Sequence, residues 1–205
     1  LERFPPGTPE HDDVKMIEDN ANRAKKTVEN LLGFARVTEG LEDTLEVAAS
    51  LRTVTELIRN TLMTAKVELV LRVPESLPRV RGDAREFQQV IFNLVANAVA
   101  AMQPTGGTLT LAAEQKDGWV HVTVADTGPG IPDRIKRRVF DPFFTTKKVG
   151  EGTGLGLSLC YGIVSKYDGR IDFASVAAED NPQAPTGTTF VVSMPVNDPA
   201  AQGRR

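Results

Sequence analysis

Residues 88–102, with the sequence QQVIFNLVANAVAAM, form an apolar segment that polar side chains interrupt at regular intervals. Gln89, Asn93 and Asn97 recur at every fourth residue, so on a helix they share one stripe. Asparagine is a mediocre helix former and is costly to bury without a hydrogen-bond partner. The segment therefore predicts a core helix whose one polar stripe faces a ligand or another polar group.

The patterns on either side of this segment alternate between helix and strand. Residues 51–65 and 157–166 have helical periodicity, and residues 116–118 form a turn between two alternating segments. Strand patterns occur at residues 67–73, 108–114, 119–124, 170–175 and 188–194. This order predicts an α+β fold, a two-layer α/β sandwich in which helices cover one face of a mixed sheet.

A heptad-like pattern precedes the sandwich. Residues 1–10 are rich in proline and glycine and predict a loop, and one long helix is expected from residue 12 to about residue 38. Its apolar positions step by three and four: Val14, Ile17, Ala21, Ala24, Val28, Leu31 and Ala35. We expect this helix to pack against a partner from another subunit or from an upstream segment. A helix that lies on its own domain is the plainer alternative.

Composition excludes several classes of protein. The net charge is -3 and no long basic stripe occurs, so nucleic acid is not an expected partner. The single cysteine, Cys160, excludes an internal disulfide framework and is expected in the core. No apolar run reaches the ~20 residues of a membrane span, so no membrane contact is expected in this chain. We expect a cytoplasmic fragment, since Leu1 is not methionine, and a membrane anchor upstream stays open.

Asp126 opens the first of two glycine-bearing loops, DTGPG, at residues 126–130. Its position has the same parity as Val120, Val122 and Val124, so in a continued strand its carboxylate points toward the apolar interior. A buried carboxylate needs donors, and the exocyclic amino group of adenine is one candidate. A plain Asp-Thr-Gly turn is the alternative reading.

The second loop, EGTGLGLS at residues 151–158, runs directly into a predicted helix. Backbone amides without side-chain bulk at a helix N-terminus form an anion site. The spacing is not that of a dinucleotide fingerprint, and no Walker lysine follows. A flexible hinge is the alternative for this loop.

Four segments together resemble the ATP-binding catalytic domain of sensor histidine kinases, within the superfamily that also holds gyrase, MutL and related ATPase chaperones. QVIFNLVANA resembles the N box, DTGPGI the first glycine box, FDPFFTTK an F box of the nitrogen-regulator type, and GTGLGL the second glycine box. They occur in family order and at family spacing, and GTTF at residues 187–190 also fits. The match covers about residues 41–196 and implies a Bergerat-type ATP-binding fold.

The resemblance also implies a domain organisation. Residues 1–40 would hold a loop and the second helix of an incomplete dimerisation and histidine-phosphotransfer hairpin. Residues 41–198 would be the ATP-binding catalytic domain, and residues 199–205 a disordered tail.

The resemblance further implies a site for ATP or ADP with Mg²⁺. Asn97 would ligate Mg²⁺, Asn93 would face the phosphates in the catalytic centre, and Asp126 would accept a hydrogen bond from adenine. Lys147 and Lys148 are expected phosphate contacts, although a solvated charge pair is nearly as good a reading. The other residues implied to bind nucleotide are Gly128, Gly130, Ile131, Gly152, Thr153, Gly154, Leu155, Gly156, Leu157 and Thr188. Phe140, Phe143 and Phe144 would form the apolar hinge of an ATP lid.

Two positions bear on the reaction. ATP-hydrolysing relatives carry a glutamate general base where this chain has Asn93, so the resemblance favours phosphoryl transfer over rapid hydrolysis. Many kinases carry a lysine at the place of Ala100, so neutralisation of the phosphates on that side is not assigned.

No histidine fits the phosphoacceptor position. His121 alternates with core valines and is expected on the opposite face of the sheet, and His11 is followed by Asp13 and Met16 where the family pattern has an apolar residue and a proline. We expect the acceptor upstream. A sensor kinase core with a homodimerising helix and a response-regulator partner is the main hypothesis. A nucleotide-gated regulator of the anti-sigma type and an ATPase clamp are the alternatives.

Overall fold

The computed structural model describes residues 4–5, 7–18, 21, 44–147 and 152–197. Within residues 44–197, a five-stranded sheet has the order β2-β4-β5-β7-β6. Its strands are β2 (Val67–Arg72), β4 (Gly107–Lys116), β5 (Trp119–Asp126), β6 (Arg170–Val176) and β7 (Gly187–Pro195). β2 and β4 are parallel and the other pairs are antiparallel, so the sheet is mixed.

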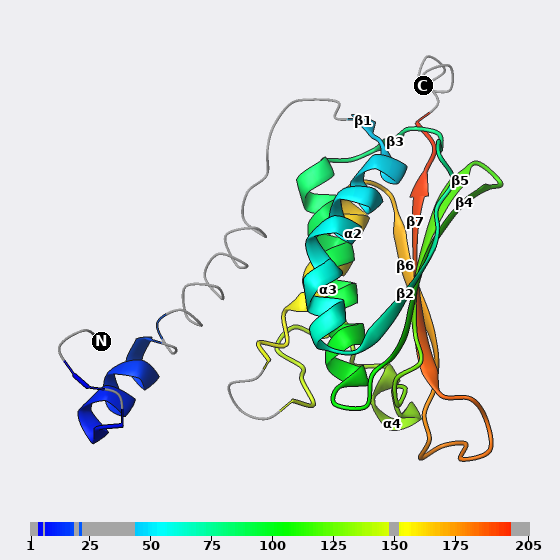
Figure 1. Ribbon diagram of the computed structural model, residues 1–205. Helices are drawn as coiled ribbons and strands as arrows, with labels where there is room; N and C mark the ends of the chain where they lie inside the picture. The colour runs from blue at the N-terminus through cyan, green and yellow to red at the C-terminus, as the bar shows by residue number, and fades with distance from the viewer. Residues whose placement is uncertain (1–3, 6, 19–20, 22–43, 148–151, 198–205) are drawn as a thin grey trace.

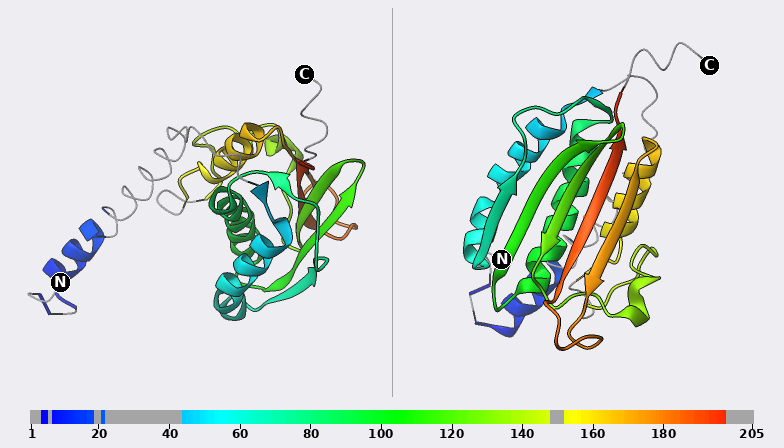
Figure 2. Two further views of the ribbon diagram at one scale, coloured as in Figure 1. Left: turned by 90° about the horizontal axis from the view of Figure 1, so that it is seen from above. Right: turned by 90° about the vertical axis from the view of Figure 1, so that its right-hand side faces the viewer.

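In the described part of the chain, the helices that pack on this sheet cover one of its faces, as the views in Figures 1 and 2 show. They are α2 (Val47–Thr64), α3 (Ala84–Met102) and α5 (Gly156–Lys166), and the short α4 (Asp133–Lys136) follows β5. Inward residues such as Val120, Val122 and Val124 meet the buried face of α3, whereas the alternating residues point to the open face. The predicted α+β sandwich with helices on one face is therefore confirmed.

Helix α3 is the central helix, and the chain fixes both its start and its neighbour. The side chain of Asp83 accepts hydrogen bonds from the backbone N–H groups of Arg85 and Glu86, each at 2.8 Å, which is a helix N-cap. The carboxylate of Glu86 then binds the Lys166 ammonium at 2.9 Å and the Tyr167 hydroxyl at 2.6 Å. These contacts join α3 to the end of α5 and hold the polar stripe of α3 in place.

The shortest elements were not predicted from the sequence. Strands β1 (Thr44–Leu45) and β3 (Val80–Arg81) pair with each other in a separate two-stranded sheet, and α4 has only four residues. Runs this short carry too little periodicity to detect. The longer elements occur where expected, with ends shifted by up to four residues.

The N-terminal helix begins earlier than expected, at Pro9, and is helical through residue 18. The hydroxyl of Thr8 accepts a hydrogen bond from the backbone N–H of His11 at 3.3 Å, and proline suits the first helical position. Ala21 is also helical, and most of the long helix expected over residues 12–38 lies outside the described residues, as does the expected tail. Among the residues that the structure describes, no helix is long and apolar enough to cross a bilayer.

Candidate functional site

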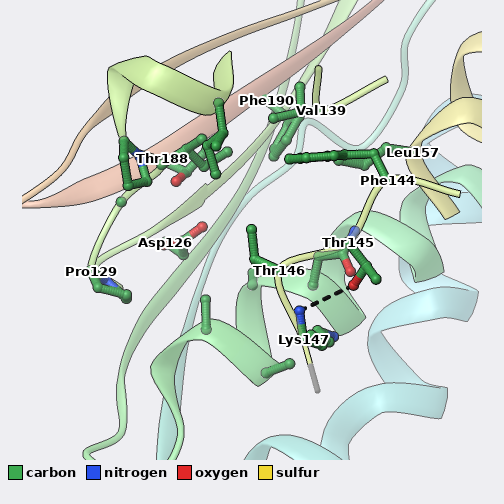
Figure 3. Close-up of a pocket in the computed structure, with 18 of the residues that line it drawn as sticks. Asp126, Pro129, Val139, Phe144, Thr145, Thr146, Lys147, Leu157, Thr188 and Phe190 are labelled. Atoms are coloured by element: carbon green, nitrogen blue, oxygen red, sulfur yellow. Dashed lines mark hydrogen bonds between the residues drawn. The ribbon is translucent and has the colours of Figure 1, made fainter. Parts of the chain in front are cut away.

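A cavity of about 440 Å³ opens where α3, the ends of β5 and β7, and the segment after β5 meet (Figure 3). This volume is in the range of small-molecule binding sites. Seven of the predicted residues line it: Asn97, Asp126, Gly130, Ile131, Lys147, Leu157 and Thr188. The structure therefore brings together residues from the N box, both glycine boxes, the F box and the last strand.

Asp126 is the last residue of β5, and its carboxyl group lines the cavity. The strand continues to Asp126, so the alternation of Val120, Val122 and Val124 extends to it as predicted. Its Oδ1 accepts a hydrogen bond from the backbone N–H of Gly128 at 2.9 Å. Burial raises the pKa of this carboxyl above its ordinary value, and hydrogen bonds from the backbone of Gly128 and Thr188 oppose the rise.

Thr188 stands beside Asp126 because β5 and β7 pair in that register. Thr188 is 6% exposed and lines the same cavity, and Figure 3 shows both side chains on its strand side. The hydroxyl of Ser175, on the neighbouring β6, lies 2.9 Å from the Thr188 hydroxyl. Sequence reasoning missed Ser175, which is not a motif residue and gains its place only through the pairing of β6 with β7.

Glycines let the backbone segments beside the cavity approach closely. Gly130 has a φ of +78°, and a Cβ there would overlap with the carbonyl group of Val176. Gly128 is buried beneath Asp126, and a Cβ on it would lie 2.8 Å from the Asp126 Oδ1. Gly128 does not line the cavity; it supports the carboxyl that does.

The polar stripe of α3 is divided between the cavity and the helix interface. Asn97 lines the cavity, whereas Asn93, one turn earlier, does not. The thiol of Cys160, which is fully buried on α5, donates to the backbone carbonyl oxygen of Val90 at 3.7 Å, and the Asn93 side chain interacts with it. Burial raises the pKa of that thiol to about 12, and the polar Asn93 side chain opposes the rise. Cys160 is thus a core residue, as predicted, and a partner of the N box.

The second glycine box lies against the F box. Gly154 has a φ of +66°, and a Cβ there would lie 2.6 Å from the carbonyl oxygen of Phe143. A Cβ on Gly152 would lie 2.9 Å from the Thr145 hydroxyl oxygen. The Thr153 hydroxyl accepts from the backbone N–H of Leu155 at 3.4 Å, and Leu155 is 2% exposed at the start of α5.

Only the last residue of this box reaches the cavity. Leu157 lines it, whereas Gly152, Thr153, Gly154, Leu155 and Gly156 lie outside its lining. The side chain of Asn93 is 4.0 Å from where a Cβ on Gly156 would be, so the start of α5 faces the polar stripe of α3. Lys148 and Glu151 lie outside the described residues.

The three phenylalanines of the F box, which the resemblance implied as an apolar hinge, lie in three different environments. Phe140 packs on the core with its ring centre 5.9 Å from Phe173, Phe144 lines the cavity, and Phe143 is 64% exposed. The Arg138 guanidinium lies 4.5 Å from the centre of the Phe144 ring. Three residues of one short turn therefore point to three environments.

Three lining residues carried no clear sequence signal: Arg134, Ile135 and Val139, which form the wall that follows β5. Pro129 of the first glycine box and Phe190 of the GTTF segment complete the wall. Arg134 is held by Glu179 at 3.0 Å, in the loop between β6 and β7. Arg134, Ile135 and Val139 follow the first glycine box without belonging to a motif, so no local pattern assigned them to the site.

Among residues 4–5, 7–18, 21, 44–147 and 152–197, no group of three His, Cys, Asp or Glu side chains is placed to hold a metal ion. An ion beside Asn97 would therefore take most of its oxygen ligands from a bound nucleotide and from water. This is the usual arrangement for Mg²⁺, which keeps several waters and uses one or two protein oxygens with substrate phosphates. The donor set of the site fits such an ion.

Comparisons with known proteins agree with this geometry. Residues 82–198 match the family described as histidine kinase-, DNA gyrase B- and HSP90-like ATPases. Sensor kinase CckA of Brucella abortus is 36% identical over 91% of this chain and 20% of its own length. Sensor histidine kinase ZraS of Escherichia coli K12 is 29% identical over 96% of this chain and 40% of its own length. The chain therefore spans less than half of either relative.

A solved structure gives the same result. The nucleotide-free catalytic domain of histidine kinase ThkA superposes with a TM-score of 0.64 and is 29% identical, covering 75% of this chain and 95% of that one. The chain belongs to the family of histidine kinase-, DNA gyrase B- and HSP90-like ATPases.

Proposed function

We propose that this chain is the kinase core of a sensor histidine kinase, which transfers the γ-phosphate of ATP to a histidine for relay to an aspartate of a response regulator. The observation that carries the proposal is the cavity that unites Asn97, Asp126 and Thr188 in a chain whose relatives are sensor kinases. The full protein would be a cytoplasmic kinase or carry its core in the cytoplasm.

The base of the nucleotide would lie at the strand end of the cavity. Asp126 offers a carboxylate beside the apolar residues Ile131, Val139 and Phe190, which suit a purine ring. An ionised carboxylate only accepts hydrogen bonds, so it matches the exocyclic amine of adenine and not the carbonyl of guanine. Gly130 and Ile131 would contact the ring, and Gly128 would hold the carboxylate in place.

The phosphates would lie between the end of α3 and the start of α5. Asn97 would hold Mg²⁺ through its amide oxygen, and Lys147 would offer a positive charge from the other wall. The backbone of residues 152–157 would supply N–H groups. When bound, the ion would neutralise charge on the phosphates.

Asn93 supports transfer over hydrolysis. A general base that activates water must take a proton, and an amide at neutral pH does not. Asn93 also lies at the interface of α3 and α5, where its side chain interacts with the buried Cys160 thiol. The reaction therefore needs a nucleophile brought to the site.

Neither described histidine is placed to act as that nucleophile. The Nδ1 of His121 lies 2.8 Å from the Ser193 hydroxyl on the open face of the sheet, whereas the cavity lies on the face that the helices cover. The Nδ1 of His11 lies 3.0 Å from the carbonyl oxygen of Phe4. We propose that the acceptor belongs to the first helix of a dimerisation hairpin, that residues 12–38 supply its second helix, and that the full protein is a homodimer.

The test adds the first hairpin helix that we propose carries the acceptor histidine. The chain is incubated with Mg²⁺ and γ-labelled ATP, alone and fused to a first hairpin helix that carries an acceptor histidine. We expect no label on the chain alone and an acid-labile label on the fusion, because positioning is most of the catalysis in phosphoryl transfer. An acid-labile label on the chain alone that a His11→Gln variant loses would make His11 the acceptor and contradict the proposal.

A further inference from the structure

Ser175 connects three segments around the nucleotide cavity. It lies on the edge strand β6, and its hydroxyl oxygen accepts a hydrogen bond from the backbone N–H of Ile131 at 2.7 Å. The same hydroxyl donates to the carbonyl oxygen of Gly187 at 2.9 Å and lies 2.9 Å from the hydroxyl of Thr188. One small side chain thus contacts the first glycine box and the start of β7.

The number of hydroxyl protons around Ser175 leaves one arrangement of hydrogen-bond donors and acceptors that satisfies all of its contacts. A serine hydroxyl has one proton and two acceptor lone pairs. The carbonyl oxygen of Gly187 cannot donate, so the Ser175 proton lies in that contact. The N–H of Ile131 occupies one lone pair, and the second lone pair remains for Thr188. In the contact between the two hydroxyls, Thr188 is therefore the donor.

This arrangement fixes what Thr188 offers to the cavity. Its only hydroxyl proton is directed at Ser175, so toward a ligand it presents lone pairs alone. Asp126, which pairs with Thr188 across β5 and β7, is likewise an acceptor when ionised. The end of the cavity where the strands meet then offers two acceptors to a bound base and no side-chain donor from this pair.

We propose that Ser175 is a positioning residue for purine specificity: it holds the Thr188 hydroxyl as an acceptor, so that this end of the cavity selects a base with an exocyclic amine over one with a carbonyl. The inference rests on the proposed function and deepens it. Ser175 acts through Thr188 and does not itself line the cavity.

The test compares ADP with inosine diphosphate, whose base carries a carbonyl and a ring N–H where adenine carries its amine and a ring nitrogen. Calorimetry gives the ratio of the two Kd values for each variant. The wild-type chain should prefer ADP. In Ser175→Ala the Thr188 hydroxyl is free to turn and donate to a carbonyl, so the preference should fall about tenfold, the scale of one hydrogen bond.

Two further variants separate positioning from a general structural role. Thr188→Val should reduce the preference by a similar factor, and adding Ser175→Ala to it should change nothing more, because the first change removes the group through which Ser175 acts. Ser175→Thr keeps a hydroxyl and should keep the preference. Ser193→Ala is the matched control, since Ser193 is a β7 serine whose hydroxyl contacts His121 instead of the cavity.

The melting temperature checks that each variant is folded. If Ser175→Ala does not fold, Ser175→Cys keeps a similar volume with only a weak donor and acceptor, and it should lose the preference in the same way. A folded Ser175→Ala or Ser175→Cys variant with an unchanged ratio would overturn the inference, as would additive effects in the double variant. Equal wild-type affinity for the two nucleotides would overturn it while leaving nucleotide binding intact. A wild-type chain that binds neither would overturn the proposed function as well.

Discussion

The two ends of the cavity are built differently. At the end that we propose binds the base (the base end), Asp126, Thr188 and Ser175 lie on adjacent strands whose backbone pairing sets their register. At the end that we propose binds the phosphates (the phosphate end), Asn97 lies on a helix. Lys147 and residues 152–155 lie outside helices and strands, with short-range contacts such as that of the Lys147 N–H with the Thr145 hydroxyl at 3.2 Å. A site fixed by strand pairing can select a base before anything else binds. A site built on loops depends more on what the ligand and its ion supply.

The largest expected effect is a loss of stability, and it tests how closely the backbone segments pack at the base end. In Gly130→Ala the new methyl group would overlap with the Val176 carbonyl, so the free energy of unfolding should fall by ~3 kcal/mol. Gly118→Ala is the matched control, because Gly118 has a φ of +79° and nothing within 4 Å of the added carbon. It should cost only ~1 kcal/mol, from backbone strain alone. Equal losses in denaturant titrations of the two variants would mean that the base end is not tightly packed.

The next effect concerns recognition of the base. Asp126→Asn should weaken ADP binding by ~2 kcal/mol, because the amide replaces a charged acceptor at the cavity with a neutral one. The Gly128 N–H can still donate to the amide oxygen, so the turn itself should persist. Calorimetry in the presence and absence of Mg²⁺ should give similar losses. A loss confined to one condition would remove the distinction between the two ends.

A smaller effect is expected at the phosphate end. Asn97→Ala should weaken ADP binding in Mg²⁺ by ~1 kcal/mol and leave binding in a chelator nearly unchanged, because one oxygen ligand of the ion is lost. Ala96→Ser, on the exposed side of the same helix and outside the cavity lining, is the control and should change neither value. If both values fall together for Asn97→Ala, its amide is structural.

The smallest effect is on stability without nucleotide. Burial raises the folded-state pKa of Asp126, so this carboxyl favours folding below its unfolded pKa of about 4 and that contribution is lost as the pH rises through the folded pKa. At pH 7 the ionised group therefore opposes folding. Asp126→Asn should raise the Tm of the nucleotide-free protein at pH 7, and the gain should shrink as the pH falls. A lower Tm at pH 7 would show that the hydrogen bonds to the carboxylate outweigh its desolvation.

The same contrast explains how far sequence reasoning reached. The parity of Asp126 with three valines predicted its orientation, since alternation along one strand is local information. The four-residue step of Gln89, Asn93 and Asn97 likewise predicted one stripe on α3. Both features depend on residues that are neighbours in the chain, and the motifs then implied the nucleotide.

Contacts between distant segments were out of reach. Ser175 meets Ile131 across 44 residues of sequence, and Asn93 meets Cys160 through the packing of α3 on α5. No sequence motif links the two members of either pair, because each contact depends on strand register or on helix packing. The directions of the F-box phenylalanines were out of reach for a related reason. One turn directs Phe140, Phe143 and Phe144 to different environments, and spacing alone does not fix a turn.

The most direct test of the account is the affinity of the wild-type chain for ADP and GDP, measured by calorimetry in Mg²⁺ and again in a chelator. We predict that ADP binds at least about tenfold more tightly than GDP, and that this ratio is the same in both solutions because the base end does not use the ion. The affinity for each nucleotide should fall when Mg²⁺ is removed. Equal affinity for the two nucleotides, or a preference that disappears with the ion, would contradict a base site fixed by the pairing of β5, β6 and β7.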